Sequence, residues 1–214
     1  MTSTGIGPPK RDTYRHGDLR RALLEAGTEL ARGGGPDAVV LREATRRAGV
    51  APSAAYRHFA DRRALLDAIC SAAQAALAVA MEEELDGLPN GGDSAEAARA
   101  RLRAVGTGYL RFAQAEPGLF RTAFSASNDL RNAASPARTG DGGLTPFQLL
   151  AAALDELVEV DVLPRERRPG AEFLAWSAVH GLAMLLIDGP LRGLDQARTQ
   201  EVGRRLLDMV ERGL

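Results

Sequence analysis

One stretch decides the fold: LREATRRAGVAPSAAYRHF, residues 41–59. It predicts two short helices, 41–48 and 52–58, with a tight break at Gly49. Two helices that meet at a steep angle through a turn of three or four residues commonly carry a glycine in that turn. Pro52 suits the first position of the second helix, where its missing N–H leaves no hydrogen bond unmade. The stretch therefore predicts a helix-turn-helix.

The exposed side of the second helix has a composition suited to a DNA groove. Ser53 and Ala54 are short enough to allow close approach to base edges. Tyr56, Arg57 and His58 follow them with donors that can hold phosphates. The pattern indicates contact with a nucleic acid.

Outward from this motif, apolar residues repeat at helical spacing along the chain, and strand patterns are nearly absent. Leu19, Leu23, Ala26 and Leu30 illustrate the spacing in the first helix. We predict an all-α protein of about nine helices, with a three-helix N-terminal head and a helical C-terminal body. The predicted helices are 17–32, 41–48, 52–58, 61–85, 94–116, 117–124, 145–160, 171–188 and a last one from about 195.

Composition favours a globular protein in a reducing compartment. Hydrophobic residues make up 45% and charged residues 26% of the 214 residues, which is ordinary for such proteins. Cys70 is the only cysteine, so no internal disulfide is possible and the reducing cytoplasm is the expected location. Residues 1–9 contain no apolar run of signal-peptide type. The three histidines are widely spread, and we expect neither a metal nor a cofactor.

Charge is divided unevenly along the chain. Residues 1–70 carry a net charge of +4, whereas residues 71–214 carry −5. A basic N-terminal part followed by an acidic remainder favours binding of a polyanion by the N-terminal part only. The apolar run Ala171–Ile187 falls short of the roughly 20 residues that a bilayer needs. Because it is apolar on nearly every side, we expect it to be buried in its own subunit and against a second subunit.

The spaced blocks YRHGDLRRALL from Tyr14, LREA, AGV, YRHF and DRRALL from Asp61 resemble the DNA-binding domain of the TetR/AcrR family of transcriptional regulators. WSAVHG, residues 176–181, is similar to the Trp-His-Gly signature of one C-terminal subgroup of that family. The resemblance implies a disordered basic arm over 1–13, a DNA-binding domain over 14–70 and a regulatory and dimerisation domain over 71–214. It also implies a cytoplasmic homodimer that represses transcription from an inverted-repeat operator and responds to a small apolar ligand.

Carried over by position, the resemblance assigns base contacts to the start of the second motif helix and phosphate contacts around it. The residues are Pro52, Ser53 and Ala54 for bases, Tyr56, His58, Arg62 and Arg42 for phosphates, and Lys10, Arg11 and Arg15 for the arm. The sequence departs from the family pattern in three places. Val40 and Leu41 stand where a hydroxyl is usual, Ala51 replaces a Ser cap, and Thr45 replaces an alanine, with its hydroxyl able to bond back to the Leu41 carbonyl. Arg46 and Arg47 we interpret as a charged helix face.

The body carries candidates for the family's two other sites. The ligand-pocket candidates are aromatic or histidine side chains, namely Tyr109, Phe112, Phe120, Phe124, Phe147, Trp176 and His180. Core packing alone is the alternative for these residues. The dimer-interface candidates lie on the last two helices: Leu182, Leu185, Leu186, Val202, Leu206 and Met209.

Two other function classes remain open to test. A helical enzyme lacks support, because the sequence has no Ser/Cys–His arrangement, phosphate loop or paired-carboxylate motif. A small-molecule carrier with a weakened DNA head is conceivable because Val40 and Ala51 lack hydroxyls. No recognisable pattern in the sequence identifies the effector or the operator sequence. Nor does any pattern distinguish a repressor from an activator.

Overall fold

The computed structural model describes residues 16–89, 94–125 and 134–214. These residues contain nine α-helices and no strand, which confirms the predicted class. The α-helices are α1 (His16–Gly34), α2 (Leu41–Arg47), α3 (Pro52–Ala55), α4 (Arg62–Asp86), α5 (Ala95–Ala115), α6 (Pro117–Ala123), α7 (Pro146–Glu159), α8 (Ala171–Ile187) and α9 (Gln196–Gly213). The predicted arm, with Lys10, Arg11 and Arg15, lies outside the described residues.

The predicted helix starts follow from side-chain caps. Asp61 accepts a hydrogen bond from the Ala64 N–H at 2.8 Å, and Ser94 accepts one from the Ala97 N–H at 3.2 Å. Thr145 forms a reciprocal capping box with Gln148 at the start of α7. Asp195 caps α9 in the same way as Asp61 caps α4. These groups satisfy N–H donors that the first helical turn leaves unpaired.

Several local features differ from the sequence-based expectation. The helix α3 ends at Ala55, and residues 56–58 form turns instead of continuing it. Three 3₁₀ helices were not predicted: η1 (Pro36–Ala38), η3 (Pro136–Arg138) and η4 (Arg165–Arg167). The Thr45 hydroxyl donates to the Arg42 carbonyl at 2.7 Å instead of to that of Leu41. Short segments of this kind depend on tertiary contacts more than on local pattern.

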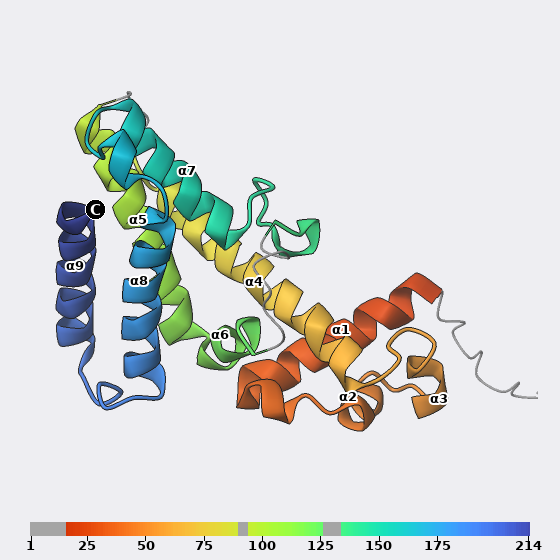
Figure 1. Ribbon diagram of the computed structural model, residues 1–214. Helices are drawn as coiled ribbons and strands as arrows, with labels where there is room; N and C mark the ends of the chain where they lie inside the picture. The colour runs from red at the N-terminus through yellow and green to blue at the C-terminus, as the bar shows by residue number, and fades with distance from the viewer. Residues whose placement is uncertain (1–15, 90–93, 126–133) are drawn as a thin grey trace, which may run out of the picture.

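The long helix α4 connects the head to the body (Figure 1). It packs against α1 of the head and against α5, α6 and α7. By length and composition α4 could cross a membrane, but Leu65, Ile69 and Leu77 are fully buried in the core of this fold. Helix α4 is therefore the central core helix that holds the two parts together.

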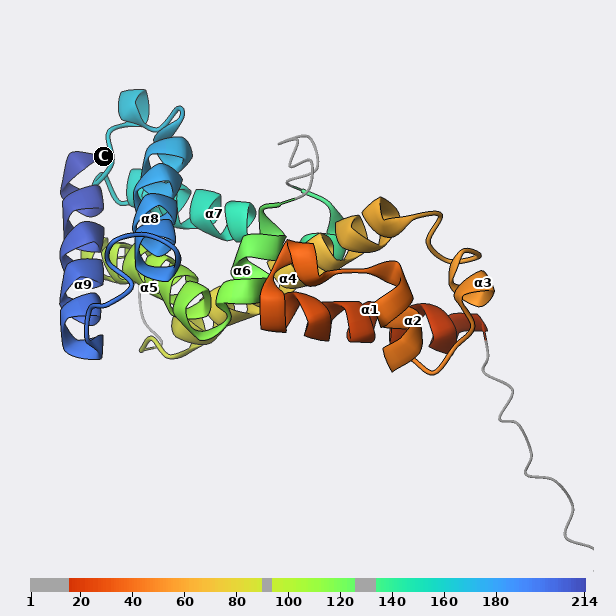
Figure 2. The same cartoon turned by 90° about the horizontal axis from the view of Figure 1, so that it is seen from below.

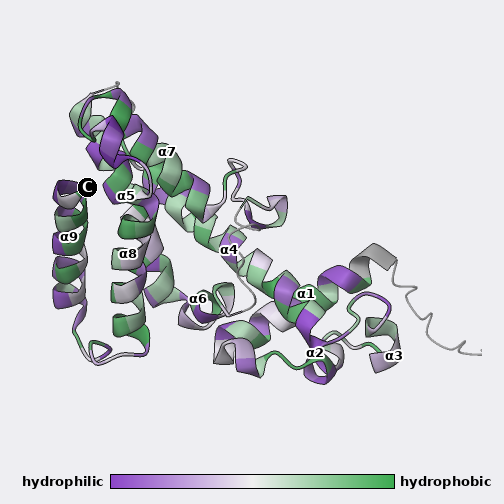
Figure 3. Ribbon diagram, in the orientation of Figure 1, coloured by the Kyte–Doolittle hydropathy of each residue, from purple (hydrophilic) through white to green (hydrophobic). Residues whose placement is uncertain are grey.

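The molecule is elongated, with α3 at one end and α9 at the other (Figure 2). In the body, α5 packs against α4, α7, α8 and α9. Apolar and polar bands alternate along α9 (Figure 3). The architecture therefore separates a small helical head from a helical body with an interior of its own.

Candidate DNA-contact surface and ligand cavity

The helix-turn-helix is held by small buried residues at the contact of α2 and α3. Ala44 and Ala55 are fully buried, and Thr45 is 2% exposed. Gly49 has φ +67°, a left-handed conformation that favours glycine, which confirms its predicted place in the turn. Phe59 is buried after the motif, with the Arg20 guanidinium 5.2 Å from its ring centroid.

Burial of that face leaves the predicted DNA contacts on the outside. Pro52 and Ser53 are exposed and Ala54 is half-buried. Tyr56 is 60% exposed, which is unusual for a large ring and argues against the half-buried core alternative for this residue. His58 is half-buried, and Arg42 is exposed at the start of α2. Helix α3, which carries Pro52, Ser53 and Ala54, lies at the end of the molecule that is farthest from α9 (Figure 1).

Val40 and Ala51 occupy the N-cap positions of α2 and α3, and neither helix start has a side-chain hydrogen bond. The N–H groups in the first turns of α2 and α3 therefore lack a hydroxyl acceptor. Such N–H groups can instead face a phosphate oxygen.

Arg62 is engaged in the structure of the head. Its Nε donates to the Val39 carbonyl at 2.6 Å and its Nη2 donates to the Pro36 carbonyl at 2.7 Å. These bonds tie the start of α4 to η1 and the segment that precedes α2. A phosphate contact from Arg62 would have to use its remaining nitrogen or replace these bonds.

Arg46 and Arg47 both pair with Glu43 on the same helix. The Arg46 Nη2 lies 2.7 Å and the Arg47 Nε 3.2 Å from the Glu43 Oε1. The hydrogen bond from Arg46, assisted by Arg47, lowers the pKa of Glu43 to about 2. The carboxylate stays ionised and offsets part of their positive charge, as in a charged helix face.

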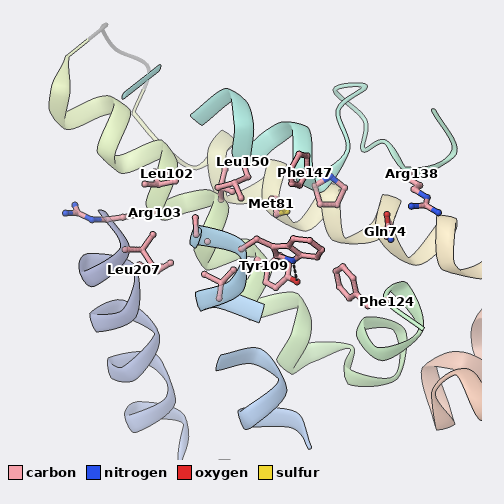
Figure 4. Close-up of a pocket in the computed structure, with 17 residues that line it drawn as sticks. Gln74, Met81, Leu102, Arg103, Tyr109, Phe124, Arg138, Phe147, Leu150 and Leu207 are labelled. Atoms are coloured by element: carbon pink, nitrogen blue, oxygen red, sulfur yellow. Dashed lines mark hydrogen bonds between the residues drawn. The ribbon is translucent and has the colours of Figure 1, made fainter. Parts of the chain in front are cut away.

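An apolar cavity of about 90 Å³ lies inside the body, among α4, α5, α7, α8 and α9 (Figure 4). Four of the predicted pocket residues line it: Tyr109, Phe124, Phe147 and Trp176. Phe112, Phe120 and His180 do not line it. Phe112 and Phe120 are buried core residues, and His180 stacks on Phe120 with ring centroids 5.5 Å apart.

Tyr109, Trp176 and His180 form a hydrogen-bonded group at the cavity wall. The Trp176 Nε1–H donates to the Tyr109 hydroxyl at 3.1 Å, and that hydroxyl lies 2.8 Å from His180 Nδ1. Because an indole N–H can only donate, the Tyr109 hydroxyl accepts the bond from Trp176. The hydroxyl is then fully satisfied when it donates its own proton to Nδ1 of a neutral His180. Burial lowers the pKa of His180 and raises that of Tyr109, which keeps both groups neutral.

Three polar residues of the cavity escaped the sequence analysis: Gln74, Arg103 and Arg138. Gln74 is 8% exposed, and its Nε2 donates to the Ala123 carbonyl at 2.8 Å. Gln74 could have been found from the sequence, because it is a glutamine at an inward position of an otherwise apolar helix. Arg138 lies in a stretch without periodicity, and no pattern in the sequence indicates its burial.

The outer side of α8 and α9 is apolar and exposed. Leu185, Val202 and Met209 are 43%, 36% and 59% exposed, as an interface requires. Leu182 and Leu186 are buried inside the subunit, on the side of α8 that faces the core, which is not the side where the exposed apolar residues lie. Leu206 is half-buried, and Phe173 and Leu174 extend the exposed surface.

Comparison with known proteins agrees with this arrangement. Residues 23–69 match the family of bacterial regulatory proteins, tetR family, and residues 102–210 match the tetracyclin repressor-like, C-terminal domain. Among curated proteins no sequence matches the chain significantly.

Solved structures share the fold over nearly the whole chain. A protein of unknown function from Rhodococcus sp. RHA1 is 27% identical, with a TM-score of 0.72 over 95% of this chain and 99% of that one. The TetR family transcriptional regulator PfmR from Thermus thermophilus is 25% identical, with a TM-score of 0.56 over 90% and 98%. A TetR family transcription regulator from Marinobacter aquaeolei VT8 is 19% identical, with a TM-score of 0.51 over 90% and 93%.

A helix-turn-helix head joined to a helical body with its own cavity defines a DNA-binding transcriptional regulator, not an enzyme. The chain belongs to the TetR family, whose C-terminal domain is the ligand-binding part.

Proposed function

We propose that the protein is a repressor that binds an inverted-repeat operator as a homodimer and releases it when a small molecule enters the cavity of the body. The observation that carries the DNA part is the exposed Tyr56 beside Pro52 and Ser53, outside a fully packed helix-turn-helix. Base reading is assigned to Pro52, Ser53 and Ala54, and phosphate contacts to Arg42, Tyr56 and His58. Arg62 contributes to DNA binding indirectly, because it stabilises the fold of the head.

The exposed apolar residues of α8 and α9 support the homodimer. A two-fold axis there would use the same surface on both subunits and present two heads to one side of the DNA. Recognition helices of such dimers lie about one helical turn of DNA apart, near 34 Å, which is why the operator is expected to be an inverted repeat. We also assign the body to the Trp-His-Gly subgroup, on the motif at 176–181.

The fold offers two routes from the cavity to the head. Helix α4 carries Gln74 and Met81 at the cavity and begins in the head. Helix α6 has Phe124 at the cavity end, and at its other end Gly118 packs on the backbone carbonyls of Ala31 and Arg32 so closely that no β-carbon would fit.

A ligand releases DNA only if it favours the conformation that DNA disfavours. A switch from mostly bound to mostly free needs about 5.5 kcal/mol of differential affinity. The protein acts in the cytoplasm, with no membrane partner. Within the described residues, no group of three or more metal-ligating side chains occurs.

The test is binding to DNA that flanks the protein's own coding region, over a range of salt concentrations. We expect one fragment to bind far better than bulk duplex, with a steep loss of affinity as salt rises. Tyr56→Ala should weaken this binding about tenfold or more without unfolding the exposed site. Arg46→Ala is the matched control, since Arg46 is paired with Glu43, and should change affinity much less.

A preference for no fragment over bulk duplex would contradict the repressor proposal. It would favour the small-molecule carrier, for which the supporting observation is that Val40 and Ala51 carry no hydroxyl that could contact a phosphate.

A further inference from the structure

Arg138 is a buried charged side chain at the edge of the cavity. It ends η3, is 9% exposed and lines the cavity beside Gln74, on the side away from Arg103 (Figure 4). In the described part of the chain its guanidinium has no hydrogen-bond or ion-pair partner, and its Nε is buried without an acceptor. A buried guanidinium without a counter-charge is strongly unfavourable, so its presence points to a missing anion.

The loop around Arg138 is built to hold it there. The Glu82 carboxylate of α4 accepts hydrogen bonds from the N–H groups of Asp141 at 2.9 Å and Gly142 at 3.1 Å. Gly140 donates its N–H to the Leu144 carbonyl at 2.9 Å, and a β-carbon on Gly140 would collide with the Glu82 carboxylate. The loop that follows Arg138 is therefore fastened to α4, which fixes the backbone next to this residue.

The charges around the cavity are one-sided. Among the described residues no carboxylate lines it, and the two charged lining residues of that part of the chain are Arg103 and Arg138. Arg103 is already paired with Asp208 at 3.5 Å and Glu211 at 2.6 Å on α9. The uncompensated positive charge is thus at the Arg138 end, and most of the remaining wall is apolar.

We propose that the cavity binds a monocarboxylate with a short apolar body, whose carboxylate pairs with Arg138 beside Gln74. This inference rests on the proposed ligand-binding role of the same cavity and names the chemical class of the ligand. The planar guanidinium fork matches a carboxylate in a bidentate geometry. A volume of about 90 Å³ restricts the apolar body to a short alkyl chain.

The test uses hexanoate and the neutral hexan-1-ol as probes on the full chain. Trp176 lines the cavity and is the only tryptophan, so its fluorescence reports binding directly. We expect hexanoate to bind saturably and hexan-1-ol to bind about 30-fold more weakly. In Arg138→Gln the two probes should bind alike. Arg103→Gln, a change of the other guanidinium at the cavity, should keep the preference for hexanoate.

A second variant separates ligand binding from a structural role. Without ligand, Arg138→Met should melt at the same temperature as the unmodified protein or higher, because it removes an unpaired buried charge. A lower melting temperature would make Arg138 a structural residue and overturn the proposal.

Other outcomes distinguish a failure of the monocarboxylate inference from a failure of the proposed function. Equal binding of hexan-1-ol and hexanoate would overturn the anion assignment while leaving the cavity as a ligand site. Tighter binding of hexyl phosphate than of hexanoate would overturn the choice of a carboxylate. If neither hexanoate nor hexan-1-ol bound, the ligand class would be wrong, whereas the operator experiment with Tyr56→Ala would still decide the repressor role.

Discussion

Trp176, His180 and Gly181 belong to one short motif, yet they face three different surroundings. Trp176 lines the cavity, His180 lies behind it against Phe120, and Gly181 is exposed on the outer side of α8. Fewer than two turns of α8 therefore join the cavity wall, the core and the proposed dimer surface. This arrangement would let a ligand that moves Trp176 act on the subunit contact through the same helix.

His180 is expected to make stability depend on pH. Burial lowers its pKa below the ordinary value of about 6.5, so the unfolded chain binds the proton more readily than the folded chain does. The free energy of unfolding should therefore fall as pH drops from about 6.5 toward the pKa of the folded state, and level off below it. Urea unfolding at a series of pH values, followed by circular dichroism, measures this slope.

His180→Asn is the comparison for that slope, because the other histidines remain in both proteins. The difference in unfolding free energy between the two proteins should shrink as the pH falls through this window. An identical pH dependence in both would show that burial of His180 does not control it.

At the scale of elements, Gly108 sets the distance between α4 and α5. A β-carbon at this position would lie 2.6 Å from the Ala80 carbonyl oxygen and from the Met81 Cα, and neither backbone atom can move aside alone. Gly108→Ala should lower the free energy of unfolding by about 1–3 kcal/mol, as overpacking does. Urea unfolding measures the change.

Gly33→Ala is the control for Gly108→Ala, because no atom lies within 4 Å of a β-carbon at Gly33 near the end of α1. Alanine favours a helix over glycine, so this variant should be as stable as the unmodified protein or up to about 1 kcal/mol more stable. Similar losses in both variants would refute the close contact of α4 and α5 as the cause.

The uncapped start of α3 offers a stabilising substitution. Ala51 has the extended conformation of an N-cap residue, and its side chain accepts nothing. Ala51→Ser should add about 1 kcal/mol by accepting a hydrogen bond from the first turn. Asp61→Ala should remove a similar amount, since the Asp61 side chain now accepts the Ala64 N–H at 2.8 Å. Hydrogen exchange in residues 52–66 would show both effects, and unchanged protection in either variant would disprove the capping argument.

Caps also explain which elements the sequence predicted well. Asp61, Ser94, Thr145 and Asp195 each stand directly before a helix and mark its start, so α4, α5, α7 and α9 were placed to within a residue or two. The end of α3 and the 3₁₀ helices carry no such mark. Their limits depend on contacts made by distant parts of the chain.

The site was predictable where side chains point outward from a motif and less so where they point inward. Periodicity shows that Phe112 and Phe120 face the interior, but it does not distinguish a cavity from a neighbouring side chain. The same limit applies to Leu182 and Leu186, which we predicted for the dimer interface and which are buried within the subunit. Each lies one position away from an exposed residue, on a helix that is apolar nearly all round.

At the scale of the whole molecule, we expect the exposed apolar surface of α8 and α9 to be buried against another protein surface. Leu174 and Leu185 are 66% and 43% exposed, and Gly181 lies between them on the same side of α8. No atom lies within 4 Å of a β-carbon at Gly181, so its own subunit does not require a glycine there. An apolar stripe with a glycine at its centre allows another helix to approach closely, which a second copy of the chain would do across a two-fold axis.

Gly181→Arg therefore tests the dimer directly. The guanidinium would lie in an apolar contact without a counter-charge, which strongly disfavours association but leaves the exposed site tolerable in one subunit. Sedimentation should give the mass of one chain for this variant and of two chains for Gly33→Arg, a change at an exposed glycine of the head. Operator binding should fall much further than for a single lost contact, because two linked heads bind far more tightly than one. A dimeric Gly181→Arg with unchanged operator affinity would move the subunit contact away from this face of α8.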